Sequence, residues 1–441
     1  MRRHFLSLTL AVLFAAPAVA AAAAWPMLMG DPRHAGRIIG PRLAPERFTL
    51  AGKFSVGAEL RASPVVAAGV LFAGAENGNL YAIDVKTRQL KWIYHAAGGI
   101  SSTPAVVDGM VFVLARDGQV HAVEAASGKP VWTFRTQGEA AFSTYGLYET
   151  PLAAGLVPDP WDFYLSSPLA HKGRIYVGSS DARVYALDAK TGKLEWTYKT
   201  GGMVHSSPVL AGANIVVGSW DGAVYALDAD SGALRWRYQT MTEQKASVML
   251  GIQGSGSVDG DTVYIGSRDA FLYALDANSG MVKWRYDAKG AWVAGTPAVD
   301  DEMVHVGTSD SYLFVGVDKR TGKERYRYDT RVWNFASPLR VGDLLIGASM
   351  AGQLVALDAK SGALRWSYRT PQATANAYGA LGADGKLDTH RLFDGGPHAL
   401  QSALEHVKRL GAFIASPIWH EGQLIAASAN GDILFFEAPA R

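Results

Sequence analysis

An acidic residue is followed, eight positions later, by a large aromatic residue at seven places along this 441-residue chain. The pairs are Asp84/Trp92, Glu124/Trp132, Asp188/Trp196, Asp228/Trp236, Asp276/Trp284, Asp318/Tyr326 and Asp358/Trp366. Most neighbouring pairs are about 40 residues apart, a period typical of stacked or radial repeat folds. Because a unit of this size cannot bury both its faces alone, neighbouring units must pack together. The pattern predicts a repeat protein.

Each repeat is predicted to be an antiparallel meander of four short strands. In residues 165–200, runs rich in Val, Tyr, Ile and Trp alternate with glycine-bearing turns such as Thr191-Gly192. The alanine of the recurring Tyr-Ala-Leu-Asp sequence lets the next sheet approach, and the tryptophan fills the widening gap between sheets. The departures from this pattern are Arg88 for the turn glycine, Glu124 for Asp, Gly316 for Ala and Tyr326 for Trp.

Serine or threonine opens each of eight units. These residues are Ser63, Thr103, Ser167, Ser207, Ser255, Thr296, Ser337 and Ser416. The eighth unit ends after its third strand, so we expect residues 51–56 to supply its fourth strand, with Phe54 in place of the tryptophan. Such closure leaves no open edge between the first and last units. The sequence predicts an all-β, eight-bladed β-propeller of four-stranded antiparallel blades, closed by an N-terminal strand.

The first 24 residues have the composition of an export signal. Arg2 and Arg3 precede an apolar run, residues 5–15, and Ala18-Val19-Ala20 is an A-x-A cleavage sequence. We expect residues 1–24 to be a cleaved signal peptide and residues 25–441 to form a single propeller in the periplasm. An ordinary secretory signal and a twin-arginine signal both fit these residues.

The chain contains no cysteine. It therefore has no disulfide, no C-x-x-C-H haem attachment, no thiolate metal site and no cysteine for a lipid anchor. The net charge of +2 gives no electrostatic reason to expect nucleic acid or an anionic membrane as a partner. We expect a soluble monomer without a membrane anchor.

Residues 186–196, Ala-Leu-Asp-Ala-Lys-Thr-Gly-Lys-Leu-Glu-Trp, resemble the tryptophan-docking motif of the pyrroloquinoline quinone (PQQ) repeat propellers. The resemblance extends over nearly the whole chain after the signal sequence, and it implies the propeller fold. This family includes periplasmic quinoprotein dehydrogenases and the non-enzymatic outer-membrane assembly protein BamB. The resemblance therefore leaves the function open between a redox protein and a scaffold.

Three insertions interrupt the regular spacing, at residues 137–164, 241–254 and 371–413. In a meander blade, each of these segments lies on the same face of the disc. Loops on a rigid scaffold are where binding residues are usually found. In the third insertion, apolar residues at helical spacing between Leu400 and Leu410 predict a short helix that covers this face as a lid.

The loops of this face supply the candidate site residues. They are Trp161, His205, Trp220, Asp221, Arg268, Asp269, Trp292, Arg331, Trp333 and Asn334. Trp292 and Trp333 lie outside the docking position that the repeat requires, which makes them the strongest candidates for ligand contact. Asp221 and Asp269 occupy positions where hairpin turns favour Asp, and His205 suits a hydrogen bond to a neighbouring loop.

Three functions are compatible with these residues and with the resemblance. In the first, the protein is a PQQ-linked oxidoreductase or redox accessory protein. Trp292 and Trp333 would stack on the planar quinone, with Ca²⁺ beside it, and Arg268 and Arg331 would hold its carboxylates. The alcohol dehydrogenases of this family stack the cofactor on a disulfide between adjacent cysteines, which this chain lacks. The alternative is a non-enzymatic scaffold, similar to BamB, that binds a periplasmic protein. A site for a saccharide or another small ligand, without redox chemistry, is a third interpretation.

The histidines give no recognisable metal site. His398 and His406 are eight residues apart in the third insertion and could share one face of a helix, but no third ligand is evident. Residues 384–388 resemble part of a calcium loop without its remaining ligands, and we interpret them as a turn. We expect no metal site of this kind and no hydrolytic constellation.

Overall fold

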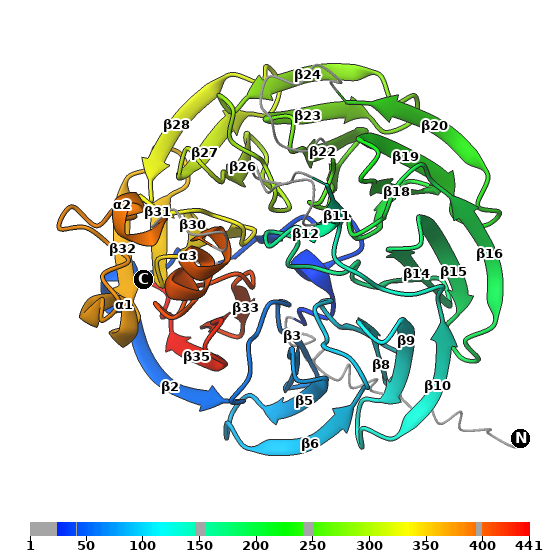
Figure 1. Ribbon diagram of the computed structural model, residues 1–441, viewed down its shortest axis with the longest axis horizontal. Helices are drawn as coiled ribbons and strands as arrows, with labels where there is room; N and C mark the ends of the chain where they lie inside the picture. The colour runs from blue at the N-terminus through cyan, green and yellow to red at the C-terminus, as the bar shows by residue number, and fades with distance from the viewer. Residues whose placement is uncertain (1–23, 41, 146–154, 241–250, 394–398) are drawn as a thin grey trace, which may run out of the picture.

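Eight four-stranded antiparallel sheets are arranged around a central axis like the blades of a propeller (Figure 1). The computed structural model describes residues 24–40, 42–145, 155–240, 251–393 and 399–441. In each blade the first strand lies innermost and the fourth strand lies at the rim. The predicted all-β, eight-bladed propeller is confirmed.

Seven blades are built from four consecutive strands each. Blade 1 contains β3 (Val65–Ala67), β4 (Val70–Gly74), β5 (Asn79–Asp84) and β6 (Leu90–His95), and blade 2 contains β7 (Ala105–Val107), β8 (Met110–Ala115), β9 (Gln119–Glu124) and β10 (Pro130–Arg135). Blade 3 contains β13 (Leu169–His171), β14 (Arg174–Ser179), β15 (Arg183–Asp188) and β16 (Leu194–Lys199), and blade 4 contains β17 (Val209–Ala211), β18 (Asn214–Gly218), β19 (Ala223–Asp228) and β20 (Leu234–Gln239). Blade 5 contains β21 (Ser257–Asp259), β22 (Thr262–Gly266), β23 (Phe271–Asp276) and β24 (Val282–Asp287). Blade 6 contains β25 (Ala298–Val299), β26 (Met303–Gly307), β27 (Leu313–Asp318) and β28 (Glu324–Asp329). Blade 7 contains β29 (Leu339–Val341), β30 (Leu344–Ser349), β31 (Gln353–Asp358) and β32 (Leu364–Arg369). Blade 8 contains β33 (Ile418–His420), β34 (Gln423–Ala427) and β35 (Asp432–Glu437), with β2 (Thr49–Ser55) as its fourth strand.

Blade 8 joins both ends of the chain, as predicted, because β2 pairs antiparallel with β35. The predicted role of Phe54, however, is wrong. In other blades the docking aromatic lies opposite a small residue of the third strand, as Trp196 lies opposite Ala186. In blade 8 the corresponding pair is Gly52 and Phe435. The large ring thus comes from the third strand, and a glycine on the fourth strand makes room for it.

In blades 1 to 5, the docking tryptophan donates its indole N–H to a backbone carbonyl of the next blade. Trp196 donates its Nε1–H to the carbonyl oxygen of Ala229 in the following blade at 3.0 Å, and its ring covers Gly232. Gly232 has a φ of +71°, and a Cβ there would lie 2.6 Å from the ring, so only glycine fits. Where blade 8 has Gly52 instead of a tryptophan, the following turn has Arg88 instead of glycine, and the Arg88 side chain lies against Gly52.

The N-terminal segment, residues 24–38, runs around the inner wall of the propeller, which the sequence analysis did not predict. Its carbonyl oxygens accept hydrogen bonds from the innermost strands of six blades. The donors are the backbone N–H groups of Val66, Val106, Leu210, Val258, Val299 and Arg340. The segment contains η1 (Leu28–Gly30) and ends in β1 (Arg37–Ile38), which pairs parallel with β29, and η2 (Pro45–Arg47) precedes β2. The inner edges of these blades are thereby paired instead of facing the channel.

All three insertions connect the fourth strand of one blade to the first strand of the next, so they belong to one face, as predicted. The first contains the hairpin of β11 (Ser143–Thr144) and β12 (Val157–Pro158). The third contains α1 (Pro371–Ala375), α2 (Thr389–Leu392) and α3 (Ala399–Lys408). Figure 1 shows the hairpin near the middle of the ring and α3 to its left, over blades 7 and 8. The predicted lid helix is α3, whereas α1 and α2 were not predicted.

The signal peptide was predicted for residues 1–24, of which residues 1–23 lie outside the described part of the chain. Most of the second insertion, residues 241–250, also lies outside it. Within the described residues, none of the helices has the length and apolar character needed to cross a bilayer.

Candidate functional site

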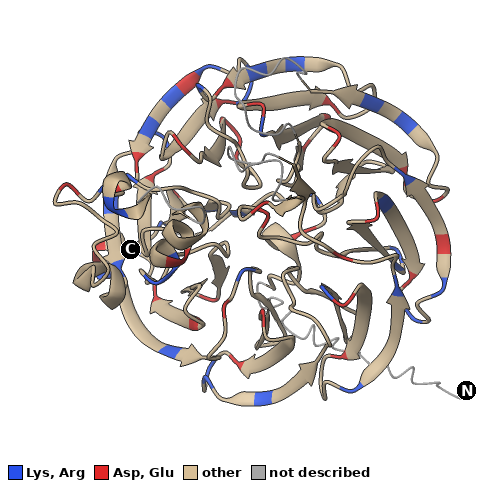
Figure 2. Ribbon diagram, in the orientation of Figure 1, with Lys and Arg blue, Asp and Glu red and all other residues tan. Residues whose placement is uncertain are grey.

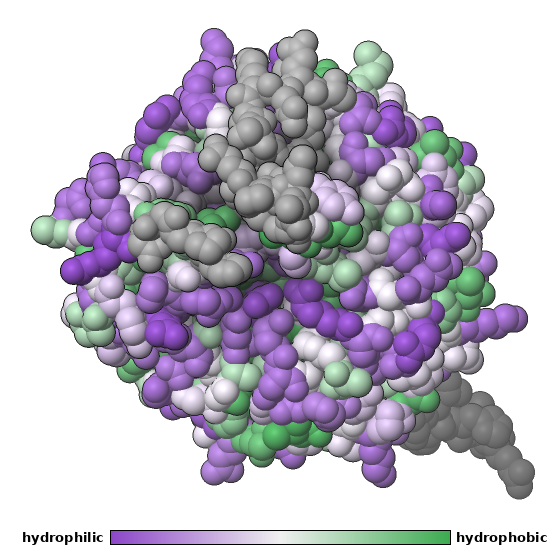
Figure 3. All heavy atoms as spheres, viewed as in Figure 1, coloured by the Kyte–Doolittle hydropathy of each residue, from purple (hydrophilic) through white to green (hydrophobic). Residues whose placement is uncertain are grey.

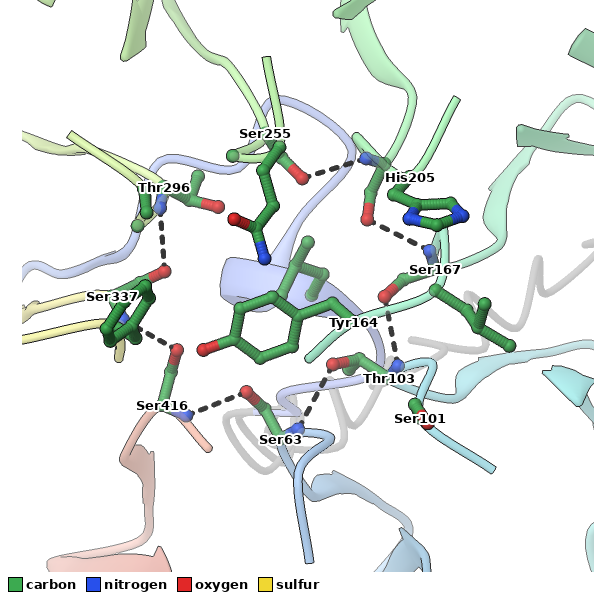
Figure 4. Close-up of a pocket in the computed structure, with 18 residues that line it drawn as sticks. Ser63, Ser101, Thr103, Tyr164, Ser167, His205, Ser255, Thr296, Ser337 and Ser416 are labelled. Carbon is green, nitrogen blue, oxygen red and sulfur yellow. Dashed lines mark hydrogen bonds between the residues drawn. The ribbon is translucent and has the colours of Figure 1, made fainter. Parts of the chain in front are cut away.

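The serine or threonine that opens each blade lies at the centre of the propeller (Figure 4). The N–H of one such residue donates to the hydroxyl oxygen of its counterpart in the next blade, as Ser167 does to Ser207 at 2.9 Å. Seven bonds of this kind, between 2.8 and 3.2 Å, connect the eight residues. The ring surrounds a chamber of about 40 Å³. A volume of this size holds a few water molecules.

Side chains from the N-terminal segment and from two insertions close this chamber. Leu28 reaches it from the N-terminal segment, and Tyr164 and Gln253 reach it from the first and second insertions. The Tyr164 hydroxyl donates to the carbonyl oxygen of Ile414 at 2.8 Å, and Gln253 Nε2 donates to that of Trp161 at 2.6 Å. Burial raises the pKa of the Tyr164 phenol far above its usual value, so the group stays neutral.

Aromatic side chains fill the mouth of the channel above the chamber. Trp161, from the first insertion, stacks on Phe335, with ring centroids 5.5 Å apart and planes 8° apart. It meets Trp333 edge-on at 4.8 Å. The buried residues Leu404 and Val407 of α3 belong to the same cluster. Ring faces that a planar ligand would need are therefore in contact with other side chains of the protein.

We call this cluster, together with the first insertion that supplies Trp161, the cap. Arg268 lies in the middle of the cap. Its guanidinium carbon is 4.4 Å from the ring centroid of Trp220 and 4.1 Å from that of Trp292. Arg268 Nη1 donates to Asp159 Oδ2 at 2.5 Å, and Nη2 donates to Gln253 Oε1 at 2.5 Å. The side chains of Arg268 and Asp159 are 1% and 0% exposed. The positive charge expected to hold a quinone carboxylate is thus neutralised by a carboxylate of the first insertion.

His205 fastens the first insertion to blade 3. Its Nδ1 is 2.9 Å from Asp162 Oδ1, and its Nε2 is 2.7 Å from Ser180 Oγ. This order of groups resembles a hydrolase triad, but Ser180 Oγ also donates to Glu139 Oε2 at 2.8 Å and accepts the N–H of Ala140 at 3.0 Å. A hydroxyl that already donates to a carboxylate has no proton for the histidine to remove. The network is therefore structural.

The charges of this network reinforce one another. Burial opposes protonation of His205, but the neighbouring carboxylate of Asp162 outweighs burial and raises the pKa of the imidazole. Burial likewise opposes ionisation of Asp162, but the charge and hydrogen bond of His205 outweigh it and lower the pKa of the carboxyl. Two buried charge pairs, Asp162–His205 and Asp159–Arg268, hold the first insertion on the propeller.

Three of the predicted residues have local structural roles. Asp221 Oδ1 accepts the N–H of Ala223 at 3.0 Å, and Asp221 Oδ2 accepts the hydroxyl of Tyr225. Asp269 makes the same two bonds in the next blade, so both aspartates hold turns. Asn334 is buried and donates to the hydroxyl of Thr330 at 2.9 Å.

The structure brings six of the ten predicted residues together in the cap. They are Trp161, His205, Trp220, Arg268, Trp292 and Trp333. Arg331 is exposed and lies beside the third insertion. The sequence analysis missed Asp159 and Asp162 as the partners of the buried cations. The sequence shows two carboxylates close to Trp161 in the insertion. It does not show that they pair with Arg268 and His205.

Comparison with known proteins identifies the family. A family model described as outer membrane protein assembly factor BamB matches residues 37–155, 160–255 and 249–387. The chain belongs to this family. Its members are built from the PQQ repeat, so the resemblance carried by residues 186–196 is confirmed.

Solved structures share the fold at low sequence identity. BamB from Moraxella catarrhalis is 17% identical, with a TM-score of 0.63 over 88% of this chain and 99% of that chain. Quinohemoprotein alcohol dehydrogenase from Comamonas testosteroni is 15% identical, with a TM-score of 0.69 over 96% and 82%. A europium-containing methanol dehydrogenase is 14% identical, with a TM-score of 0.66 over 94% and 98%. Comparison with curated protein sequences finds no match. At these identities the likeness shows the fold alone.

The described residues do not fit PQQ. The chamber of about 40 Å³ is far smaller than a typical small-molecule pocket of about 300–1,000 Å³. The faces of Trp161 and Trp333 are packed, and the Arg268 charge is paired. Nor does the described part of the chain gather three or more His, Asp or Glu side chains in a position to hold a metal ion.

Proposed function

We propose that this protein is an exported, non-enzymatic scaffold that binds another protein through its insertion-bearing face. The closed channel carries the proposal. Three residues are best suited to hold a planar cofactor. Of these, Trp292 and Trp333 are buried in the cluster that contains Trp161, and the charge of Arg268 is neutralised by Asp159 of the first insertion. The PQQ repeat serves here as architecture, and the outer surface of the cap remains for binding.

The hairpin of the cap offers a surface for such a partner. Thr144 pairs with Val157, and Tyr145 and Leu156 are the next residue on each side toward the turn. Tyr145 and Leu156 are 61% and 58% exposed. Protein interfaces are enriched in aromatic residues at their centres, and exposed apolar groups on a fixed element suit that role.

Export supports the same proposal. The basic and apolar segments of residues 1–24 have the order of a secretory signal. The matching family is described as an outer membrane assembly factor, and such a protein works outside the cytoplasm.

Site-specific photo-crosslinking in the cell envelope tests the proposal. A photoreactive phenylalanine analogue replaces Tyr145 or Leu156, and the control places it at Ile39, which directly follows the N-terminal segment and is 84% exposed. We expect one discrete protein adduct from positions 145 and 156 and none from position 39. Full export with no adduct from either position of the hairpin would overturn the proposal.

A PQQ titration tests the quinoprotein alternative. The purified protein is titrated with PQQ, with and without Ca²⁺, while tryptophan fluorescence and quinone absorbance are followed. We expect no saturable binding up to about 100 µM, an affinity limit of about −5.5 kcal/mol. One-to-one binding that is lost in Trp292→Ala would refute the closed-channel argument and favour a redox protein.

A further inference from the structure

Many arginines at the rim of the propeller have a carboxylate partner. Figure 2 shows positions occupied by Lys and Arg, in blue, along the outer strands β20, β24 and β28. Arg235 pairs with Asp228 at 2.7 Å, and Arg325 pairs with Asp318 at 2.5 Å. Because such pairs are locally neutral, they leave little net charge for a ligand.

Arg331 and Arg369 differ from these rim arginines. Arg331 follows β28 of blade 6, and Arg369 ends β32 of blade 7. Neither guanidinium has an ion-pair partner within the described part of the chain, and Arg331 Nη1 donates to the backbone carbonyl oxygen of Asp384. A carbonyl oxygen satisfies the donor but does not neutralise the charge.

The two guanidinium groups converge on one place. A Cβ on Gly385 would lie 3.5 Å from Arg331 Nη1 and 3.5 Å from Arg369 Nη2, so the two nitrogens are no more than twice that distance apart. Both arginines line a pocket of about 260 Å³ whose other walls are α1 and residues 381–385. Figure 3 shows that hydrophilic residues predominate at this edge of the insertion-bearing face.

The walls of this pocket are held by the protein itself. Asn376 Nδ2 donates to the carbonyl oxygen of Leu381 at 2.6 Å, and the Leu381 N–H donates back to Asn376 Oδ1 at 3.1 Å. Leu381 and Leu387 are both buried and bridge the two sides of the loop. The side chain of Thr370 caps α1 through the N–H of Ala373 at 3.1 Å. A ligand therefore meets a site that is already formed.

We propose that the pocket binds a phosphate group, free or as part of a phosphate ester. A phosphate dianion matches the charge of the two arginines, and its tetrahedral oxygens can accept hydrogen bonds from both guanidinium groups at once. A carboxylate carries one charge and would leave one guanidinium uncompensated. This inference does not depend on the scaffold function proposed above.

The neighbouring acids are engaged with the backbone. Asp384, which also lines the pocket, accepts the N–H of Lys386 at 3.0 Å, and Asp329 accepts the N–H of Arg331 at 2.7 Å. They reduce the positive potential without forming an ion pair with either guanidinium. The phosphate site is accordingly of moderate affinity and sensitive to salt.

Calorimetric titration of the exported protein at low ionic strength tests the site. The probes are inorganic phosphate, glycerol 3-phosphate and acetate, in a buffer without other multivalent anions. We expect phosphate to bind with a Kd on the order of 0.1–1 mM and acetate at least tenfold more weakly. Co-sedimentation with vesicles that contain phosphatidic acid, a phosphate monoester, shows whether a lipid headgroup also reaches the site.

The variants Arg331→Gln and Arg369→Gln should each weaken phosphate binding about tenfold, since each removes a charge-assisted hydrogen-bond donor. Arg325→Gln is the matched control, because this exposed rim arginine is paired with Asp318 and lies outside the pocket. Its phosphate affinity should equal that of the unaltered protein. Thermal melting of all three variants reports whether they fold.

Phosphate binding that both pocket variants leave unchanged would overturn the proposal. So would the absence of saturable binding below about 10 mM, or equal affinity for acetate, because charge alone would then explain the association. Binding of glycerol 3-phosphate without vesicle binding would support a soluble ester, and arginine-dependent vesicle binding would support a lipid phosphate.

Discussion

Replacing Asp159 by Asn should loosen the cap strongly. The substitution keeps the side-chain volume but removes the carboxylate that neutralises Arg268, and both side chains are fully buried. Removing one partner of a buried ion pair typically costs about 3–5 kcal/mol, because the other charge is left uncompensated. Arg268 keeps Gln253 and the two tryptophan rings, so we expect a cost near 3 kcal/mol, at the lower end of that range.

Limited proteolysis of the first insertion measures this change. If the free energy of local opening of the cap falls by about 3 kcal/mol, the population of the open cap rises about 100-fold. When opening is fast relative to cleavage, the cleavage rate in residues 137–164 rises by the same factor. The matched control is Asp230→Asn, which breaks an exposed pair with Arg174 and should change stability by no more than about 0.5 kcal/mol.

A double-mutant cycle of Asp159→Asn and Arg268→Gln isolates the pair. We expect a coupling energy of about 2 kcal/mol or more, as for residues that share a buried network. A coupling near zero, together with a proteolysis rate like that of the control, would mean that the pair is not desolvated. The cap would then be open in solution, and the argument that the channel is closed would fail.

Three further changes test other parts of the structure. The raised pKa of His205 contributes cap stability that is complete below pH 6.5, the unfolded value, and is lost as the pH rises through the folded pKa. Protease resistance of the first insertion should therefore fall as the pH rises above 6.5, and His205→Gln should abolish that dependence; an unchanged profile would contradict the assignment. Gly232→Ala should cost about 2–4 kcal/mol in thermal or chemical unfolding, because its Cβ would meet a tryptophan ring. Gly173→Ala, with a similar φ and open space, should cost only about 1 kcal/mol, and equal costs would refute the docking argument. Trp25→Ala should destabilise the propeller by about 3–5 kcal/mol, since the ring is buried in the core of blades 7, 8 and 1, and a melting temperature unchanged within 2 °C would contradict this.

The blades could be predicted because their signals are local. The aspartate, the turn glycine and the tryptophan lie within nine residues of one another, and each repeat states the same pattern again. Closure by an N-terminal strand followed from counting strands. The register of that strand did not, because Phe54 is the only aromatic residue of β2 and its sequence alone did not show that Phe435 supplies the large ring.

The departures from the repeat acquire their meaning only in three dimensions. Gly52 belongs to blade 8 and Arg88 to blade 1, yet the two residues lie against each other where a tryptophan would otherwise dock. Either substitution alone is unexplained by its own repeat. The contact between the two blades accounts for both.

The sequence by itself determined the class of fold, the number of blades and the face that carries the insertions. Tertiary structure decided the state of the site. Asp159 and Arg268 are 109 residues apart in the chain, and no spacing rule connects them. The N-terminal segment has no periodicity, and its bonds go to six different blades. Local patterns specify strands because neighbouring residues share a face. The pairing of a buried charge depends on which loops the closed ring brings together.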